Sequence, residues 1–218
     1  MKSILIIGMG RFGHHLCKNL IEQKNEIMIV DKFESAVEDM MPLVTSALVA
    51  DCTKEDVLSH LGVSNFDICF VCIGSDFQSN LEITCLLKEL GAGYVVSMSK
   101  RVIHTKFLLR NGADEVIHPD KDIAERVAIK YSNDNIFDYI ELRNDYSIFE
   151  ISPLKEWVGH SLKDSDIRAK YNISIIAVKD ENSEMNVTLH ADYVIKPNDH
   201  LMIISRKKDI DNVIKKLQ

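Results

Sequence analysis

Short apolar runs alternate with helix-like segments along the first half of the chain. Ile4–Gly8, Glu26–Val30 and Ala47–Ala50 have the length and composition of buried strands, and a segment with a helical pattern follows each of them. A nearly continuous apolar run, Ile68–Ile73, extends the series. Strands that alternate with helices in this way form a parallel sheet covered by helices on both faces. We therefore expect an α/β fold with a doubly wound parallel sheet of the Rossmann type.

The pattern changes after a helix expected at Asp120–Tyr131. A polar stretch at 132–135 is followed by a hydrophobic segment, Ile136–Leu142, and then by alternating apolar and polar residues, as in Tyr146–Ile151. Such alternation is typical of strands with one solvated face. Further strands are expected at Ile173–Val178, Tyr193–Ile195 and Leu201–Ser205, and a closing helix at Asp209–Leu217. We predict a Rossmann nucleotide-binding domain over 1–134, a hydrophobic linker or crossover over 135–144, and a second, small α+β C-terminal domain over 145–218.

The composition limits the classes of partner. The chain has 218 residues, with 33 acidic and 26 basic side chains and a formal net charge of -7. Proteins that bind nucleic acid usually carry a basic surface, so we expect no nucleic-acid partner. The five cysteines mostly lie in apolar runs, as the reduced thiols of a cytosolic protein do. No stretch approaches the roughly 20 apolar residues of a membrane span, so any role at a membrane would depend on a partner.

A glycine-rich turn joins the first expected strand to the first expected helix. It has the sequence Gly8-Met9-Gly10-Arg11-Phe12-Gly13 and matches the dinucleotide-binding pattern G-x-G-x-x-G. In that pattern the first glycine permits the tight turn, the second lets phosphates approach the backbone, and the third lets the helix pack closely. Arg11 lies inside the turn, where a guanidinium could contact a third phosphate or a phosphate bound by the neighbouring subunit. The alternative is an ordinary surface arginine.

The ends of the other expected strands meet at the same crevice, because open α/β sheets bind ligands beyond the carboxyl ends of their strands. Asp31 lies close to the spacing of about 20 residues at which such folds place a ribose-binding acid. Its charge would repel a 2′-phosphate, so NADP is the least expected dinucleotide. The candidate cofactor-binding residues therefore also include Asp31 and Lys32. Asp51 and Cys52 would lie near the adenine edge, and Ile73, Gly74 and Ser75 beneath the sugar and phosphates. Thr53 could contribute here or cap the next helix.

Together these residues resemble the regulator-of-potassium-conductance domains, also called KTN domains, of Ktr- and Trk-type potassium uptake systems and ligand-gated potassium channels. The resemblance covers nearly the whole chain. Besides the glycine turn and Asp31, it rests on Ala50-Asp51-Cys52-Thr53, Ile73-Gly74, Gly112-Ala113-Asp114, His118-Pro119-Asp120-Lys121-Asp122, Gly159-His160-Ser161-Leu162 and Pro197-Asn198-Asp199-His200-Leu201.

The resemblance implies a nucleotide-binding regulatory subunit that assembles as dimers within an octameric ring and gates a membrane-embedded potassium-translocating subunit. It would be cytoplasmic and associated with the inner face of the cell membrane through that pore. The ligand in the cleft would be ATP or ADP, or NAD or NADH as in Trk-like members. Arg11, by analogy, would reach a terminal phosphate, which favours ATP and ADP.

Two further ligands follow from the resemblance alone. Asp120 falls where similar proteins often carry a Glu that helps hold a divalent cation between the nucleotides of a dimer, although Asp is shorter and could instead cap a helix. Arg168, Asn172 and Ile173 fall where the family's C-terminal domain can bind cyclic di-AMP, and the alternative is a purely structural dimer contact. The segment Ser97-Met98-Ser99 departs from the family, which often has a basic residue there, and Lys100 is displaced from that position.

The competing interpretation is a small NAD(H)-dependent oxidoreductase. Hydride transfer needs a general acid or base over the nicotinamide and a wall that excludes water. None of the eight histidines stands in a recognisable catalytic pairing, and the C-terminal domain is small for such a wall. A redox-sensing transcription factor would need a basic DNA-reading segment, which the sequence lacks. We therefore expect a protein that is not an enzyme.

Overall fold

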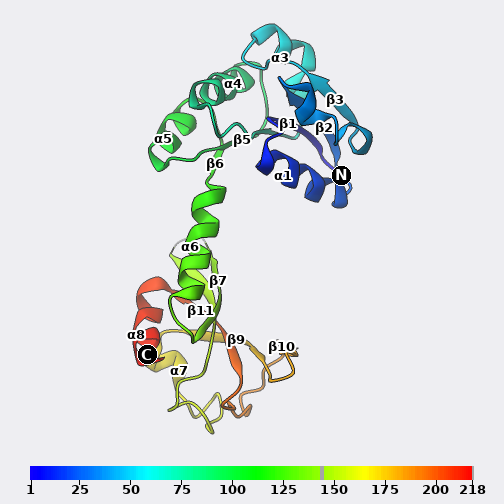
Figure 1. Cartoon of the computed structure of the whole chain (residues 1–218). Helices are drawn as coiled ribbons and strands as arrows, with labels where there is room; N and C mark the ends of the chain where they lie inside the picture. The colour runs from blue at the N-terminus through cyan, green and yellow to red at the C-terminus, as the bar shows by residue number, and fades with distance from the viewer. Residues whose placement is uncertain (143–144, 218) are drawn as a thin grey trace. The chain divides into compact units, whose positions relative to one another are not determined.

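The computed structural model describes residues 1–142 and 145–217, which form two compact units, Met1–Lys121 and Asp122–Gln218 (Figure 1). Each unit is built on one sheet with its own apolar core. Within the described residues, no helix combines the length and apolar character that crossing a membrane requires.

The first unit contains a six-stranded parallel sheet in the order β3-β2-β1-β4-β5-β6. The chain runs from β1 to β3 toward one edge, then returns beside β1 and continues to β6 toward the other edge. This reversal makes the carboxyl ends of β1 and β4, between which the strand order reverses, the topological switch point, where such sheets bind ligands. The predicted Rossmann fold is confirmed. The strands are β1 (Ser3–Ile7), β2 (Glu26–Asp31), β3 (Ser46–Val49), β4 (Ile68–Val71), β5 (Val95–Met98) and β6 (Glu115–Ile117).

Helices cover both faces of this sheet. Along β1, Ile4 and Ile6 belong to one apolar cluster and Leu5 and Ile7 to another, because successive side chains of a strand point to opposite faces. The helices α1 and α2 contribute to the first cluster, and α3 and α4 to the second. The helices of this unit are α1 (Arg11–Glu22), α2 (Glu34–Val37), α3 (Glu55–Leu61), α4 (Phe77–Glu89) and α5 (Val102–Arg110), with 3-10 turns at Met41–Leu43 and Val63–Asn65. The next helix, α6 (Pro119–Tyr131), begins in this unit, and its residues from Asp122 on belong to the second unit.

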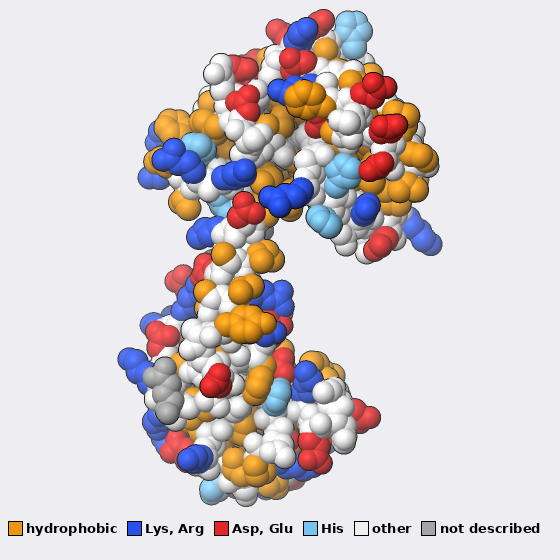
Figure 2. Space-filling view, in the orientation of Figure 1, with side chains coloured by type: hydrophobic (Ala, Val, Ile, Leu, Met, Phe, Trp, Pro, Cys, Tyr) orange, Lys and Arg blue, Asp and Glu red, His pale blue; other side chains and the backbone are white. Residues whose placement is uncertain are grey.

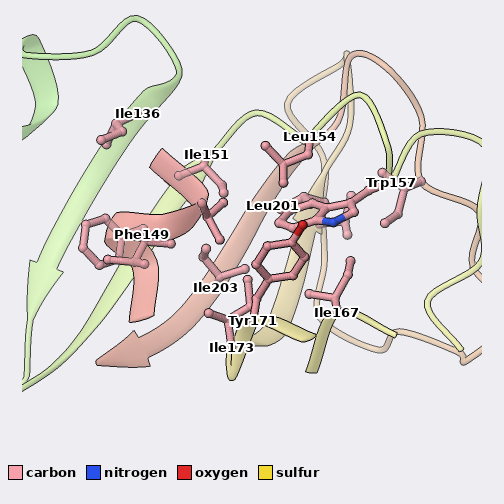
Figure 3. Close-up of a cluster of buried hydrophobic side chains, with 14 of the residues drawn as sticks. Ile136, Phe149, Ile151, Leu154, Trp157, Ile167, Tyr171, Ile173, Leu201 and Ile203 are labelled. Atoms are coloured by element: carbon pink, nitrogen blue, oxygen red, sulfur yellow. The ribbon is translucent and has the colours of Figure 1, made fainter. Parts of the chain in front are cut away.

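The second unit has a five-stranded antiparallel sheet in the order β10-β9-β11-β8-β7. One face of the sheet and the two helices enclose a core in which Trp157 and Tyr171 pack against strand residues such as Ile151 and Leu201 (Figure 3). This confirms a small α+β domain. Its elements are β7 (Ile136–Glu141), β8 (Tyr146–Ile151), α7 (Ile167–Tyr171), β9 (Ser174–Lys179), β10 (Met185–Asn186), β11 (His200–Arg206) and α8 (Lys207–Leu217).

The elements near the predicted linker differ from the expectation. Ile136–Glu141 forms the edge strand β7 instead of a free crossover, and Ile136 is buried against β8. The compact units divide after Lys121, within α6, because later residues of that helix contact the second unit, as in the ion pair between Arg126 and Asp138. The strand expected at Tyr193–Ile195 is wrong, since that segment forms only an isolated bridge between Ser161 and Val194.

Candidate functional site

A cavity of about 720 Å³ opens at the carboxyl ends of the strands of the first unit. Its walls are the turns that follow β1, β2, β3, β4 and β5, together with the start of α6. This is the switch point of the sheet, and the volume lies within the range of small-molecule sites.

Nearly all of the predicted cofactor-binding residues line this cavity. Gly13 does not, because it lies behind the turn. The predicted residues in the lining are Gly8, Met9, Gly10, Arg11, Phe12, Asp31, Lys32, Asp51, Cys52, Ile73, Gly74 and Ser75. That they bind a ligand stays a prediction.

The three glycines of the turn have three different surroundings. Gly8 has a φ of +95°, and its N–H donates to the carbonyl oxygen of Val30 at 2.9 Å. A Cβ on Gly13 would lie 2.2 Å from the carbonyl oxygen of Gly8, so only glycine lets α1 pack this closely. A Cβ on Gly10 would meet no atom within 4 Å and would enter open space. The turn therefore leaves the backbone at Gly10 accessible from the cavity.

Helix α1 presents its N-terminus to the cavity. Gly10 is the N-cap residue, no side chain caps the helix, and its first turn carries no acidic residue. The first N–H groups of a helix have no partner within it, and the helix dipole adds partial positive charge there. An N-terminus with these properties suits a phosphate group. Arg11 is exposed and lines the cavity beside it.

Asp31 connects two walls of the cavity. Its Oδ2 accepts a hydrogen bond from the N–H of Met9 at 2.7 Å, and its Oδ1 accepts one from the N–H of Phe33 at 3.0 Å. The carboxylate therefore joins the turn after β1 to the turn after β2. Each carboxylate oxygen can accept more than one hydrogen bond, so a ligand hydroxyl could still be bound by this partly exposed side chain.

Asp51 organises the turn after β3. Its Oδ1 accepts hydrogen bonds from the hydroxyl of Thr53 at 2.8 Å and from the N–H of Thr53 at 3.1 Å. The bond from the Thr53 hydroxyl has the larger effect in lowering the pKa of the Asp51 carboxyl below its ordinary value, and the bond from the Thr53 N–H lowers this pKa further. Thr53 does not cap the next helix, because the N-cap of α3 is Lys54 and it makes no side-chain capping bond. The turn thus presents a carboxylate that stays ionised at neutral pH.

The turns after β4 and β5 bring a lysine into the lining. A Cβ on Gly74 would lie 2.9 Å from Cε of Met98 and 3.1 Å from Cε of Lys100, so the aliphatic part of Lys100 lies against Gly74. Lys100 thus lines the cavity although it is displaced in the sequence. Beneath it, the amide Nδ2 of the buried Asn80 donates to the carbonyl oxygens of Ile73 at 2.7 Å and Met98 at 2.9 Å. This amide joins the ends of the two strands.

The two cysteines in the lining are suited to packing. Burial raises the pKa of the Cys52 thiol to about 12, and the charges of Asp51 and Asp31 add to the effect. Burial also raises the pKa of Cys72 to about 12. Neutral thiols at neutral pH are poor nucleophiles and poor metal ligands.

Asp120 lies in the first turn of α6, is exposed, and lines the cavity. Among residues 1–142 and 145–217, no group of three or more His, Cys, Asp and Glu side chains could hold a metal ion. Asp120 therefore belongs to no such group within the described part of one chain, and its role at a cation stays a prediction.

Of the residues predicted for cyclic di-AMP, Arg168 lies in α7, and Asn172 and Ile173 directly follow this helix. Arg168 is exposed, whereas Ile173 is only 1% exposed and belongs to the core of the second unit. Asn172 ends the helix with a φ of 54°, and its Nδ2 donates to Oδ2 of Asp209 at 2.8 Å. Arg168 and Asn172 are thus exposed and Ile173 is not, and the binding of a second ligand stays a prediction.

Sequence reasoning missed several lining residues. Phe33 follows Asp31 and Lys32 directly, so the proximity to a candidate site could have indicated it. The other missed residues line the cavity because the folded chain brings them there, and no sequence pattern indicates this. The lining residues beyond those predicted are His15, Phe33, Ala36, Ala50, Cys72, Asp76, Ser79, Ile83, Met98, Lys100 and Pro119, with Ile7 at the end of β1.

On the face drawn in Figure 2, acidic and basic side chains are interspersed.

Comparison with known proteins identifies the family. Residues 4–119 match the TrkA-N domain and residues 146–218 match the TrkA-C domain. The chain therefore belongs to the family of proteins built from a TrkA-N and a TrkA-C domain, which confirms the resemblance seen in its motifs.

Named relatives align over almost the whole chain. It is 38% identical to the Ktr system potassium uptake protein C of Bacillus subtilis (strain 168), over 99% of this chain and 97% of that protein. It is 35% identical to the Ktr system potassium uptake protein A of the same organism, over 96% and 94% of the two chains. The GsuK channel bound to NAD has the same fold, with a TM-score of 0.69 at 18% identity. The alignment covers 100% of this chain but 39% of the GsuK chain.

Proposed function

We propose that this chain is a nucleotide-binding regulatory subunit that gates a membrane-embedded potassium-translocating subunit. The observation that carries the proposal is the similarity to two Ktr system potassium uptake proteins over nearly the full length of each. Both domains are included, so the similarity is not confined to a generic nucleotide-binding fold. We infer that the chain acts at the cytoplasmic face of the membrane through its pore partner and does not itself catalyse a reaction.

The cavity supports a nucleotide as the ligand. Its two ends differ in chemistry, which would orient such a molecule. The uncapped N-terminus of α1, Arg11 and Lys100 offer positive charge for phosphates. Asp31 offers carboxylate oxygens for ribose hydroxyls, and Asp51 lies beyond it on the side of β3. These positive groups would bind nucleotides with different numbers of phosphates with different affinities, so the number of phosphates would be the regulatory signal.

Among nucleotides, we propose ATP and ADP as the preferred ligands, with NAD or NADH as the alternative. Arg11 lies beside the helix N-terminus, where an added terminal phosphate would bring further negative charge. The GsuK channel binds NAD in a related fold, which keeps the dinucleotide open. The divalent cation at Asp120 and cyclic di-AMP at Arg168, Asn172 and Ile173 remain proposals from family resemblance, and no step of the gating argument uses them.

Gating would follow from unequal binding. A ligand shifts a conformational equilibrium only by its differential affinity for the two states. A shift from about 1:99 to 99:1 needs roughly a 10⁴-fold difference in affinity, and several sites in one assembly can share it. We propose that the chain forms a homo-oligomer, dimers within an octameric ring, because a ring adds the contributions of several cavities.

Complementation of potassium uptake tests the proposal. A bacterium without its own high-affinity potassium uptake would express a Ktr-type pore subunit alone, with this chain, or with the Gly10→Ala variant. We expect growth at low potassium to require the wild-type chain, and the chain to co-purify with the pore. If uptake does not depend on the chain and the purified chain reduces small carbonyl substrates with NADH, the oxidoreductase interpretation is correct instead.

A further inference from the structure

Phe33 is a large apolar side chain in the wall of the cavity that remains 60% exposed. Single exposed hydrophobic residues are common on protein surfaces and need no explanation by themselves. Phe33 differs because its exposed surface contributes to a concave site, on the turn after β2. In such a site an uncovered aromatic ring is available to a ligand.

The position of Phe33 is fixed relative to the ribose-binding candidate. The N–H of Phe33 donates to Oδ1 of Asp31 at 3.0 Å, so the same carboxylate holds the turn that carries the ring. The ammonium of Lys32 lies 5.2 Å from the centre of the Phe33 ring, which is within the range of a cation–π contact. The aromatic ring is therefore carried by a residue that is hydrogen-bonded, through its backbone, to the carboxylate that would bind a ribose.

The neighbouring wall has the chemistry of a base-binding site. Ala36 and Ala50 contribute small apolar side chains on the side of β2 and β3. The two hydrogen bonds that the Asp51 carboxylate accepts from described residues both end on Oδ1. Its Oδ2 could therefore accept a hydrogen bond from an amino group of a base. Two of the positive groups, Arg11 and Lys100, lie at the start of α1 and in the turn after β5, whereas Lys32 lies beside Phe33.

From this arrangement we propose that the base of the bound nucleotide stacks on the ring of Phe33. This contact would contribute to the affinity of the chain for nucleotides. The inference rests on the proposed function, since it presumes that the cavity binds a nucleotide. Stacking on an aromatic side chain tolerates different bases, because every base has a π face. Asp51 would then add preference for a base that carries an amino group over one that carries a carbonyl at the same position.

Binding measurements on the purified full-length chain test this inference. ATP and inosine triphosphate, which carries a carbonyl where adenine has an amino group, would be titrated calorimetrically into the wild type and the variants Phe33→Ala and Phe33→Trp. Phe107→Ala is the matched control, because Phe107 is a 46% exposed phenylalanine of the same unit that is not part of the lining. The melting temperature of each unliganded variant would also be recorded.

We expect Phe33→Ala to weaken both triphosphates by roughly 5- to 100-fold, the range that corresponds to the loss of one stacking contact. Phe107→Ala should bind as the wild type does, and Phe33→Trp should retain binding. The chain has one native tryptophan, Trp157, buried in the second unit, so ATP-dependent quenching that appears only in Phe33→Trp would report stacking directly.

Binding by Phe33→Ala within twofold of the wild type, or the absence of quenching in a Phe33→Trp variant that binds ATP, would overturn the inference while leaving the proposed function intact. A wild-type chain that binds no nucleotide would instead contradict the proposed function. A large drop in the melting temperature of unliganded Phe33→Ala, with the same drop in binding of every ligand, would also count against a stacking role.

Discussion

Alanine at Gly13 should disturb the packing of helix α1, whereas alanine at Gly10 should disturb ligand binding. At Gly13 a Cβ would lie 2.2 Å from the Gly8 carbonyl oxygen, and ordinary contact begins only at 3.4 Å. Helix α1 would have to move away from the turn by about an ångström, and overpacking of this kind costs about 1–3 kcal/mol. At Gly10 the same methyl group meets no atom within 4 Å. It would occupy space that a phosphate needs.

The two variants should therefore fail in different assays. For Gly13→Ala, a destabilisation of about 2–3 kcal/mol corresponds to a fall of roughly 5–15 °C in the melting temperature of the first unit. For Gly10→Ala, alanine is a poorer N-cap than glycine but lowers the entropy of the unfolded chain, and the two effects, each below about 1 kcal/mol, offset each other. Its melting temperature should stay within a few degrees of the wild type.

Calorimetric or fluorescence scans with and without ATP provide the assay, because a ligand of the native state raises the melting temperature. Gly10→Ala should lose most of the rise that ATP produces in the wild type. The reasoning is refuted if Gly10→Ala binds ATP with the wild-type affinity, because the backbone at Gly10 would then not face the ligand. It is refuted on the packing side if Gly13→Ala melts as the wild type does.

Three other changes have distinct expected outcomes. Asp31→Asn offers one acceptor oxygen to two backbone N–H groups, so ATP affinity should fall by about tenfold or more, measured by titration calorimetry. Asn80→Leu leaves two carbonyl oxygens without their amide donor and should weaken ATP binding, whereas Thr84→Val, a buried change one turn further along α4, should lower the melting temperature and keep the affinity. Hydrogen bonds from the Tyr171 hydroxyl and then from the Lys216 ammonium, with the charges of Lys170 and Lys216, lower the pKa of Glu156 from 4.5 to about 2. That contribution to stability is present above pH 4.5 and is lost as the pH falls toward 2, so Glu156→Gln should show a shallower loss of stability in this window when denaturation is followed against pH.

Much of the first unit could be predicted from the sequence because its signals are local. The apolar runs that became β1, β2 and β4 are buried on both faces, and the glycine turn joins a strand to a helix as its pattern requires. The ends of parallel strands converge, so Asp31 and Asp51 could be assigned to one crevice without coordinates.

Other parts depend on tertiary structure that no local pattern encodes. The edge strand β7 has an irregular register between Ile136 and Asp138, which breaks the alternation that would have marked it as a strand. Lys100 enters the lining because Gly74, far from it in the sequence, has no side chain in the way. The amide of Asn80 joins two strand ends that meet only in the folded sheet.

Potassium flux through a reconstituted pore tests the central claim most directly. Proteoliposomes would contain a Ktr-type pore subunit with the wild-type chain or with Arg11→Ala, and potassium flux would be measured with ATP, with ADP and without nucleotide. The account predicts that flux depends on the chain and differs between ATP and ADP, and that Arg11→Ala reduces this difference. Flux that is the same with and without the chain, or indifferent to nucleotide when the chain is bound, would contradict it.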